Sequence, residues 1–218
     1  MKRRKIAPIV RHIIPPFVKL VWIKEVTGLE NLPKNDKPFI IVPNHSSYMD
    51  HVIVSCVVIP HINRKIHFIA KKEHFETLTQ STWHSLWTKY ITFIPIDRDK
   101  GEEALNSALS YLRKGAIVLI YPEGTRTLTR KIQEGKTGTA RLALAAKVPV
   151  LPIGFIGTFK ILPKGKKIPK LKKATMNIGK LMYFDEYYGK KVTRSLLRKI
   201  TNDLMKEIAR LSNQKYNF

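Results

Sequence analysis

The chain has 218 residues, 44% of them hydrophobic, so it can bury one sizeable core and fits a single domain better than two. Lys and Arg total 40 against 16 Asp and Glu, and the resulting formal charge of +24 predicts an anionic partner. A single cysteine, Cys56, excludes an intramolecular disulfide, and no residue cluster predicts a metal, so we expect neither a cofactor nor a bound metal.

Residues 1–25 form a basic amphipathic segment, which we separate from a domain predicted over residues 26–218. Its apolar stretch is interrupted by charged residues and prolines. These interruptions argue against a membrane-spanning helix, which needs about 20 mostly apolar residues. Two interpretations stay open: a helix lying on an acidic membrane surface, and a helix packed on the domain.

A first polar motif follows the apolar run at residues 39–42, which predicts a buried strand. It contains Asn44, His45 and, five residues after the histidine, Asp50. A histidine oriented by a carboxylate can act as a general base near neutral pH. No Gly-x-Ser-x-Gly motif accompanies the pair, so we expect the substrate to supply the attacking hydroxyl. The alternative is structural, with His45 hydrogen-bonded in the core and Asp50 capping a helix.

Two further apolar runs, at residues 66–70 and 91–96, predict strands that are followed by basic side chains. Lys71 directly follows the first run, and Arg98 lies shortly after the second. Arg98 could bind a phosphate through its planar guanidinium, or it could pair on the surface with a neighbouring aspartate.

A second polar motif follows the apolar run at residues 116–120, another predicted strand. The motif consists of Glu123, Gly124, Thr125 and Arg126. The glycine permits close approach of the backbone, the threonine adds a hydroxyl donor, and the arginine suits a pair of phosphate oxygens.

Strand and helix patterns alternate along most of the chain. Besides the strands above, residues 148–156 predict a strand, and residues 102–113, 137–146 and 193–211 predict helices. This alternation predicts a single α/β domain with a central mixed or mostly parallel sheet flanked by helices.

A lysine-rich segment stands out near the end of the chain. Residues 164–173 contain six lysines, a proline and a glycine, which predicts an exposed basic loop. The loop could simply be solvated, or it could contact anionic lipid headgroups.

Taken together, the motifs resemble the glycerophospholipid acyltransferases of the 1-acylglycerol-3-phosphate type, also called PlsC or lysophosphatidate acyltransferases. The resemblance covers roughly residues 26–158, and four blocks match in order. They are Asn44-His45-x4-Asp50, residues 93–98, Pro122-Glu123-Gly124-Thr125-Arg126 and residues 148–153, with Lys136-Thr137-Gly138 between the last two.

The resemblance implies a glycerolipid acyltransferase-like fold and a role for each matching residue. His45 would act as general base, Asp50 would orient it, and Lys71 would stabilise the oxyanion that develops on a thioester. The remaining matching residues would bind the phosphate-bearing acceptor: Asn44, Arg98, Glu123, Gly124, Thr125, Arg126 and Lys136.

The expected function is transfer of a fatty acyl group from acyl-CoA or acyl carrier protein to 1-acylglycerol-3-phosphate, which forms phosphatidic acid. Another lysolipid or glycerol-3-phosphate is an alternative acceptor, and acyl hydrolysis is an alternative reaction. A basic nucleic-acid-binding protein is the competing class, but it leaves the four blocks unexplained, so we expect no nucleic acid partner. The expected location is the cytoplasmic face of the cell membrane, with peripheral or monotopic attachment to an anionic surface.

Overall fold

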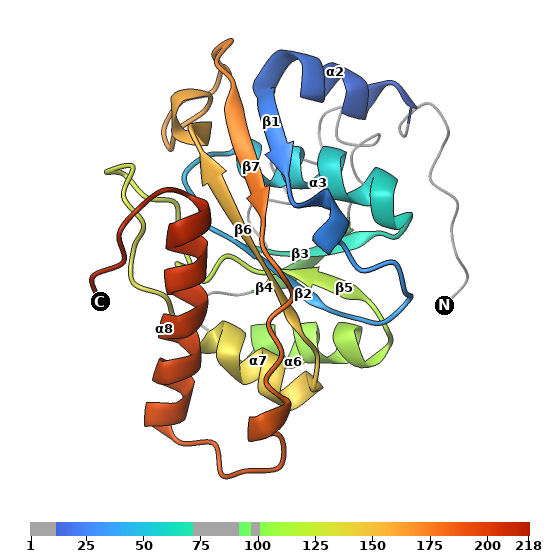
Figure 1. Ribbon diagram of the computed structural model, residues 1–218, viewed down its shortest axis with the longest axis vertical. Helices are drawn as coiled ribbons and strands as arrows, with labels where there is room; N and C mark the ends of the chain where they lie inside the picture. The colour runs from blue at the N-terminus through green and yellow to red at the C-terminus, as the bar shows by residue number, and fades with distance from the viewer. Residues whose placement is uncertain (1–11, 72–91, 97–100) are drawn as a thin grey trace.

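The structure, a computed structural model, describes residues 12–71, 92–96 and 101–218 (Figure 1). In this part of the chain seven strands form one sheet in the order β1-β7-β6-β2-β5-β3-β4. Their bounds are β1 Ile23–Thr27, β2 Ile40–Pro43, β3 Ile66–Lys71, β4 Thr92–Ile96, β5 Ile117–Leu119, β6 Val150–Ile156 and β7 Ala174–Ile178.

The sheet is mixed, with one change of direction. The strands from β6 to β4 are mutually parallel, whereas β7 runs antiparallel to β6 and β1 runs parallel to β7. The predicted α/β domain with a mixed, mostly parallel sheet is therefore confirmed.

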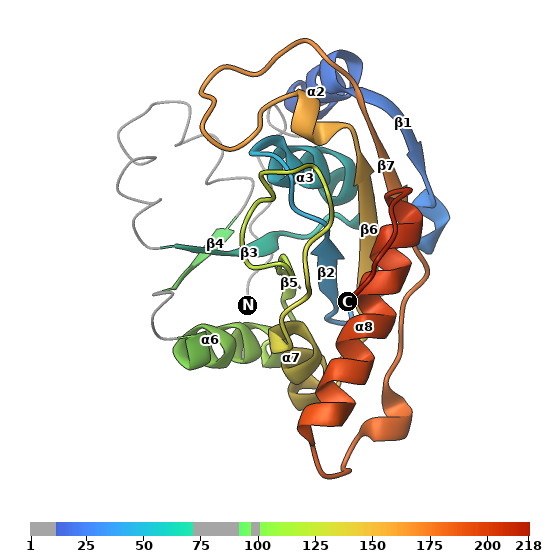
Figure 2. The same cartoon turned by 90° about the vertical axis from the view of Figure 1, so that its left-hand side faces the viewer.

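Helices cover both faces of the sheet (Figure 2). Helices α2 and α3 lie on one face, and α6, α7 and α8 lie on the other. Their bounds are α2 Ile14–Trp22, α3 Met49–Ile62, α6 Gly101–Arg113, α7 Gly138–Ala146 and α8 Arg194–Leu211, and the short 3-10 turns are η1 Leu29–Asn31, η3 Thr158–Lys160 and η4 Asp185–Tyr187. None of the described helices combines the length and the apolar character needed to cross a bilayer.

The central strands are buried on both faces, and each face contributes to a separate hydrophobic cluster. In β2, Ile41 packs with α2 and α3, whereas Ile40 and Val42 pack with α6, α7 and α8. Successive side chains of a strand point to opposite faces, so both clusters draw on the same short strand. This explains why the predicted strands are continuous apolar runs without polar alternation.

The amphipathic helix α2 packs on the domain with one side and leaves its other side exposed, and contact of that exposed side with a membrane stays a prediction. One side packs on the core, where Val18 is 3% exposed, while Phe17 and Leu20 on the other side are 56% and 73% exposed. The boundary drawn between residues 25 and 26 falls within β1, so the described part of this segment is continuous with the domain.

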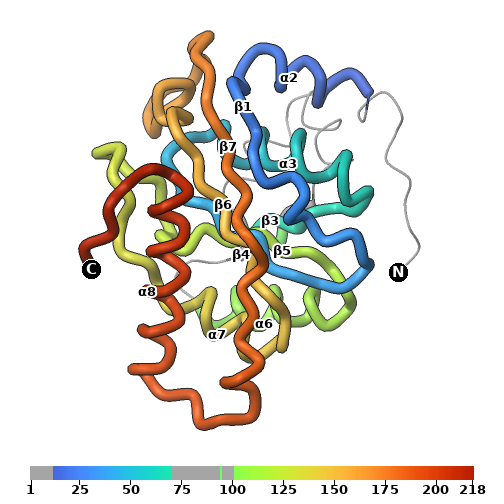
Figure 3. Tube along the Cα trace, in the orientation of Figure 1, coloured from blue at the N-terminus to red at the C-terminus, as the bar shows by residue number. Residues whose placement is uncertain are grey.

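Helix α8 packs closely against β6, the strand next to β2 in the sheet. The chain trace shows α8 running alongside β6 (Figure 3), and Thr193 caps the helix by accepting a hydrogen bond from the Leu196 N–H. At Gly154 in β6, an added Cβ would lie 2.3 Å from the carbonyl carbon of Leu211. A glycine is therefore required for this close approach of helix and strand.

Candidate active site

Two loops meet at the edge of the sheet where β2 and β5 end. The histidine loop, residues 44–48, follows β2, and the arginine loop, residues 121–127, follows β5. Because β2 and β5 are parallel neighbours, their carboxyl ends lie side by side. The Thr127 N–H donates to the His45 carbonyl at 3.0 Å, which joins the two loops directly.

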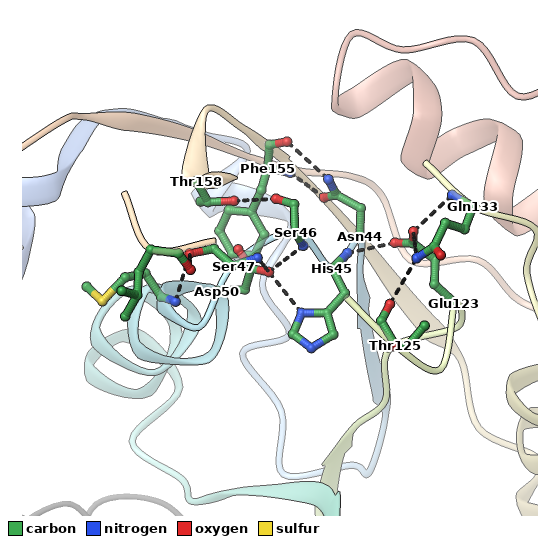
Figure 4. Close-up of polar contacts among 12 residues, drawn as sticks. Asn44, His45, Ser46, Ser47, Asp50, Glu123, Thr125, Gln133, Phe155 and Thr158 are labelled. Atoms are coloured by element: carbon green, nitrogen blue, oxygen red, sulfur yellow. Dashed lines mark hydrogen bonds and ion pairs between the residues drawn. The ribbon is translucent and has the colours of Figure 1, made fainter. Parts of the chain in front are cut away.

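A buried carboxylate organises the histidine loop (Figure 4). Asp50 lies in the first turn of α3 and is fully buried. Its Oδ2 lies 2.9 Å from His45 Nδ1 and accepts backbone N–H bonds from Ser46 and Ser47, both at 2.8 Å. A carboxylate can only accept, so Nδ1 carries the proton and Nε2, on the other side of the ring, has the basic lone pair.

Tyr121 packs flat against the imidazole of His45. The two ring centroids are 3.6 Å apart and the planes meet at 15°. The Tyr121 hydroxyl is buried and has no hydrogen-bond partner among the described residues. Burial, followed by the nearby Asp50 charge, raises the pKa of Tyr121 well above its usual value, so the ring stays neutral beside His45.

Glu123 connects the arginine loop to the histidine loop through its carboxylate. It is 3% exposed, and its Oε1 accepts the His45 N–H at 2.7 Å while its Oε2 accepts the Gln133 N–H at 2.9 Å. Burial raises the pKa of Glu123 to about 7, against the lowering effect of these hydrogen bonds. With both oxygens engaged by the protein, Glu123 positions the two loops, and its predicted direct contact with an acceptor stays a prediction.

Gly124 is required by the turn that it occupies. Its φ of 73° lies in the left-handed region, and an added Cβ would lie 3.1 Å from Lys136 Nζ. The Lys136 side chain therefore crosses directly over the arginine loop, and the Lys136 N–H donates to the Pro122 carbonyl at 2.8 Å. The predicted residues Gly124 and Lys136 are thus brought together at the arginine loop.

Arg126 contacts the histidine loop through Tyr48. Its Cζ is 3.3 Å from the ring centroid of Tyr48, an arrangement typical of a cation–π contact. Arg126 and Thr125 are partly exposed, in contrast to the buried Glu123. A guanidinium stacked on a tyrosine keeps its N–H groups available around its edge, as an oxyanion ligand requires.

Asn44 directly precedes His45 in the chain and is 3% exposed. Its Oδ1 accepts the Phe155 N–H at 2.7 Å, and its Nδ2 donates to the Phe155 carbonyl at 3.2 Å. These two bonds continue the pairing of β2 with β6 by one step beyond the last strand residue. The contacts favour a positioning role for Asn44, and the predicted contact with substrate stays a prediction.

The segment after β6 supports the histidine loop from the other side. The hydroxyls of Ser46 and Thr158 share a hydrogen bond at 2.8 Å, and the Leu162 carbonyl accepts from Ser47 Oγ at 2.9 Å and from the Tyr48 N–H at 3.0 Å. Both serine hydroxyls beside His45 are therefore buried and engaged away from its ring.

Lys71 and Arg98 are the two remaining predicted residues. Lys71 is the last residue of β3, at the same edge of the sheet as the two loops. Arg98 lies outside the described residues. Within the described ranges, no three His, Cys, Asp or Glu side chains gather as ligands for a metal ion.

Sequence reasoning missed the residues that hold the two loops together. Tyr121, Tyr48, Gln133 and Thr158 contribute a stacking surface, a cation–π partner, and hydrogen bonds. Tyr48 lies within the Asn44–Asp50 block and Tyr121 stands directly before the Pro122–Arg126 block, and these two positions were the available signals.

A histidine–aspartate pair after one parallel strand, with an arginine-bearing loop after its neighbour, is the arrangement expected of a glycerophospholipid acyltransferase. The chain belongs to the Acyltransferase family, whose model matches residues 24–156. The resemblance seen in the four blocks is therefore confirmed.

Relatives with established names share one description. A 1-acyl-sn-glycerol-3-phosphate acyltransferase of Chlamydomonas reinhardtii is 36% identical over 152 residues, which cover 70% of this chain and 43% of that protein. The chloroplastic enzyme BAT2 of Brassica napus is 31% identical, with 71% and 42% covered. The chain thus spans less than half the length of these two relatives. The enzyme of Bacillus subtilis (strain 168) is 29% identical, and 87% of this chain and 88% of that protein are covered.

One solved structure supports the fold. The crystal structure of the 1-acyl-sn-glycerophosphate acyltransferase PlsC from Thermotoga maritima is similar with a TM-score of 0.70 and 24% sequence identity. The match covers 96% of this chain and 80% of that chain.

Proposed function

We propose that this chain is a 1-acylglycerol-3-phosphate O-acyltransferase, which transfers a fatty acyl group from a thioester donor to a lysophosphatidate hydroxyl and so forms phosphatidic acid. The donor is acyl-CoA or acyl carrier protein. The shared description of the relatives supports the acceptor, and the site geometry supports the chemistry.

The observation that carries the proposal is the His45 ring between Asp50 and Tyr121. Asp50 sets the tautomer, since it accepts the Nδ1 proton, and the stacked tyrosine restricts rotation of the ring. The Ser46 and Ser47 hydroxyls are engaged elsewhere, which argues against a nucleophile from the histidine loop. The arrangement therefore suits a base that activates a hydroxyl of the substrate.

In the proposed reaction, His45 Nε2 removes the proton of the acceptor hydroxyl as its oxygen attacks the thioester carbonyl carbon. The tetrahedral intermediate collapses with formation of the ester bond and cleavage of the carbon–sulfur bond. The departing thiolate takes the proton from the imidazolium, which the Asp50 carboxylate stabilises while it exists. No protein nucleophile and no metal take part in these steps.

Acceptor binding is assigned to the exposed side of the arginine loop. Arg126 and Thr125, with Lys136 crossing over Gly124, offer cationic and hydroxyl donors to one phosphate. Arg98 and Lys71 are proposed to complete the phosphate and oxyanion sites. A bound phosphate would hold the acceptor hydroxyl near His45, which is unnecessary for simple thioester hydrolysis.

We place this activity at the cytoplasmic face of the cell membrane, with peripheral or monotopic attachment. The formal charge of +24 and the exposed apolar side of α2 both support binding to an anionic lipid surface.

The test offers purified protein a panel of lysolipids with acyl-CoA and acyl carrier protein donors, and identifies products by mass spectrometry. We expect phosphatidic acid from lysophosphatidate, and His45→Ala should lower turnover by roughly 10²–10⁴-fold because a positioned base is lost. His61→Ala is the matched control, since His61 lies in the last turn of α3 and, among the described residues, hydrogen-bonds to the Val57 carbonyl of its own helix.

Two outcomes would overturn the proposal. Near-normal turnover by His45→Ala would remove the histidine from the chemistry. Release of free fatty acid without ester product would identify a hydrolase instead.

A further inference from the structure

Helix α2 presents an apolar side for which the described part of the protein provides no cover. Ile13, directly before the helix, is 60% exposed, and Phe17 and Leu20 follow on the same side at helical spacing. The opposite side, with Ile14 and Val18, packs on the core beside α3, and Trp22 at the end of the helix contacts both the core and the ring of Phe17. The orientation of the helix is therefore fixed by the domain, and its apolar outer side faces solvent.

The basic loop, residues 164–173, presents a second group of exposed apolar side chains. It lies between η3 and β7, and its lysines are exposed as predicted. Ile168 and Leu171 are each 81% exposed, although lysines surround both in the sequence. Two large aliphatic side chains held this far into solvent among cations match the composition of segments that enter a lipid headgroup region.

These two features form one surface. The Trp22 indole N–H donates to the Lys170 carbonyl at 3.2 Å, which joins the end of α2 to the basic loop. Figures 1 and 2 both show α2 and this loop at one end of the molecule, the end toward which β6 points.

The same surface borders the candidate active site. The Lys170 N–H donates to the Ile161 carbonyl, and the next residue, Leu162, accepts hydrogen bonds from Ser47 and Tyr48 of the histidine loop. The basic loop is therefore connected to the segment that supports His45.

We propose that the basic loop is a second membrane anchor beside α2, and that its partner is a bilayer containing anionic lipid. Ile168 and Leu171 enter the headgroup region while the lysines pair with lipid phosphates. Two linked contacts fix the orientation of the domain, so the His45 edge faces the lipid surface. This inference rests on the proposed function, because the proposed acceptor is a lipid.

The test measures co-sedimentation of the 218-residue chain with vesicles of neutral phosphatidylcholine, with and without anionic phosphatidylglycerol. Ile168→Ser/Leu171→Ser should lower affinity for anionic vesicles by roughly tenfold or more, because the variant loses two aliphatic side chains that become buried in the lipid on binding. Both side chains are so exposed that the thermal unfolding midpoint should not change, which checks the fold.

The matched control is Tyr183→Ser/Val192→Ser, which removes two side chains that are 61% and 53% exposed. Tyr183 follows Met182, which pairs with Val150 at the start of β6, the end of that strand away from the basic loop. This control should bind vesicles like the unmodified protein.

A second pair of variants tests the charge. Lys166→Gln/Lys167→Gln/Lys172→Gln should lower binding to anionic vesicles by about fivefold per lysine and leave weak binding to neutral vesicles unchanged. The control, Lys190→Gln/Lys191→Gln/Lys206→Gln, has the same net charge but keeps the basic loop intact. Equal losses in the two triple variants would mean that only the net charge matters, and would overturn the anchor.

Unchanged vesicle binding by Ile168→Ser/Leu171→Ser would also contradict the proposal that the basic loop is a membrane anchor. Tighter binding of the protein to double-stranded DNA than to anionic vesicles would contradict it as well. These outcomes are separate from the proposed reaction, which is assayed with a short-chain acceptor in detergent and without vesicles. Loss of transfer in that assay would contradict the proposed function and leave the vesicle result standing.

Discussion

The histidine loop and the arginine loop meet at one edge of the sheet, but they are held in different ways. Within the histidine loop, the Asp50 carboxylate collects hydrogen bonds from residues three to five positions earlier in the chain. The arginine loop has no such local centre, and its buried Glu123 instead reaches to His45 and Gln133. The first loop is therefore organised locally, whereas the second depends on contacts between distant segments.

The largest expected effect tests the Asp50 carboxylate, which organises the histidine loop. Asp50→Asn keeps the size of the side chain but removes its charge, so an imidazolium at His45 loses its stabilising partner. We expect kcat to fall by roughly 10²–10⁴-fold with little change in the acceptor KM. Steady-state kinetics measure this, with Asp203→Asn on the exposed side of α8 as control. A kcat within about threefold of the unmodified enzyme would contradict a role for the carboxylate.

The next effect tests the long-range connection through Glu123. Its pKa is raised from 4.5 to about 7 in the folded protein, so the folded state binds more protons than the unfolded state between these values. Its contribution to stability is thus full below about pH 4.5 and is lost as the pH rises through about 7.

Glu123→Gln removes this titration. Between pH 4.5 and about 8, we expect the free energy of unfolding of the unmodified protein to decline by up to about 3 kcal/mol more than that of the variant. Urea unfolding at several pH values measures the difference. Parallel curves would show that burial does not raise the pKa of Glu123.

A smaller effect tests the exposed part of the arginine loop. Arg126→Ala removes the proposed phosphate ligand, and we expect the acceptor KM to rise by roughly 10- to 100-fold, as for a lost hydrogen bond to a charged group. Arg130→Ala is the control, because Arg130 stacks near Phe159 and is exposed. An unchanged KM for Arg126→Ala would remove this residue from the acceptor site.

The smallest effect concerns Tyr121, the residue of the arginine loop that stacks on His45 of the histidine loop. Tyr121→Phe keeps the ring stacked on His45 and deletes a buried hydroxyl without a partner among the described residues. We expect the free energy of unfolding to rise by about 1 kcal/mol and kcat to stay within about twofold. A large loss of kcat would instead give the hydroxyl a part in the reaction.

The fold was predictable where the sequence has a single dominant pattern. The apolar runs that became β2, β5 and β6 were found because both faces of these strands are buried. The strand β1 was missed since it lies at the sheet edge and is mostly exposed, with only Ile23 buried. A helix was expected to begin near Asp50, but the bounds of α3 were not predicted, because this helix is buried on nearly all sides and lacks the apolar stripe of a surface helix.

For the candidate site, sequence spacing was enough to pair His45 with Asp50, because both belong to one short loop and helix start. The shared site of that loop and Arg126 was implied by the family resemblance, and the structure brings them together because β2 and β5 are parallel neighbours. The roles of Glu123 and Asn44 could not be predicted in this way. A carboxylate or an amide can bind a substrate or a backbone, and only the folded chain decides which partner lies within reach.

The amide of Asn44 couples strand alignment to the placement of the imidazole. Its two bonds to Phe155 form only when Ile41 lies opposite Leu151, as observed. A shift of β2 by one residue relative to β6 would break both hydrogen bonds. It would also turn the side chain of His45, the next residue, toward the other face of the sheet. Misaligned molecules would therefore be inactive as well as less stable, so recovered activity after refolding would report correct assembly of the sheet.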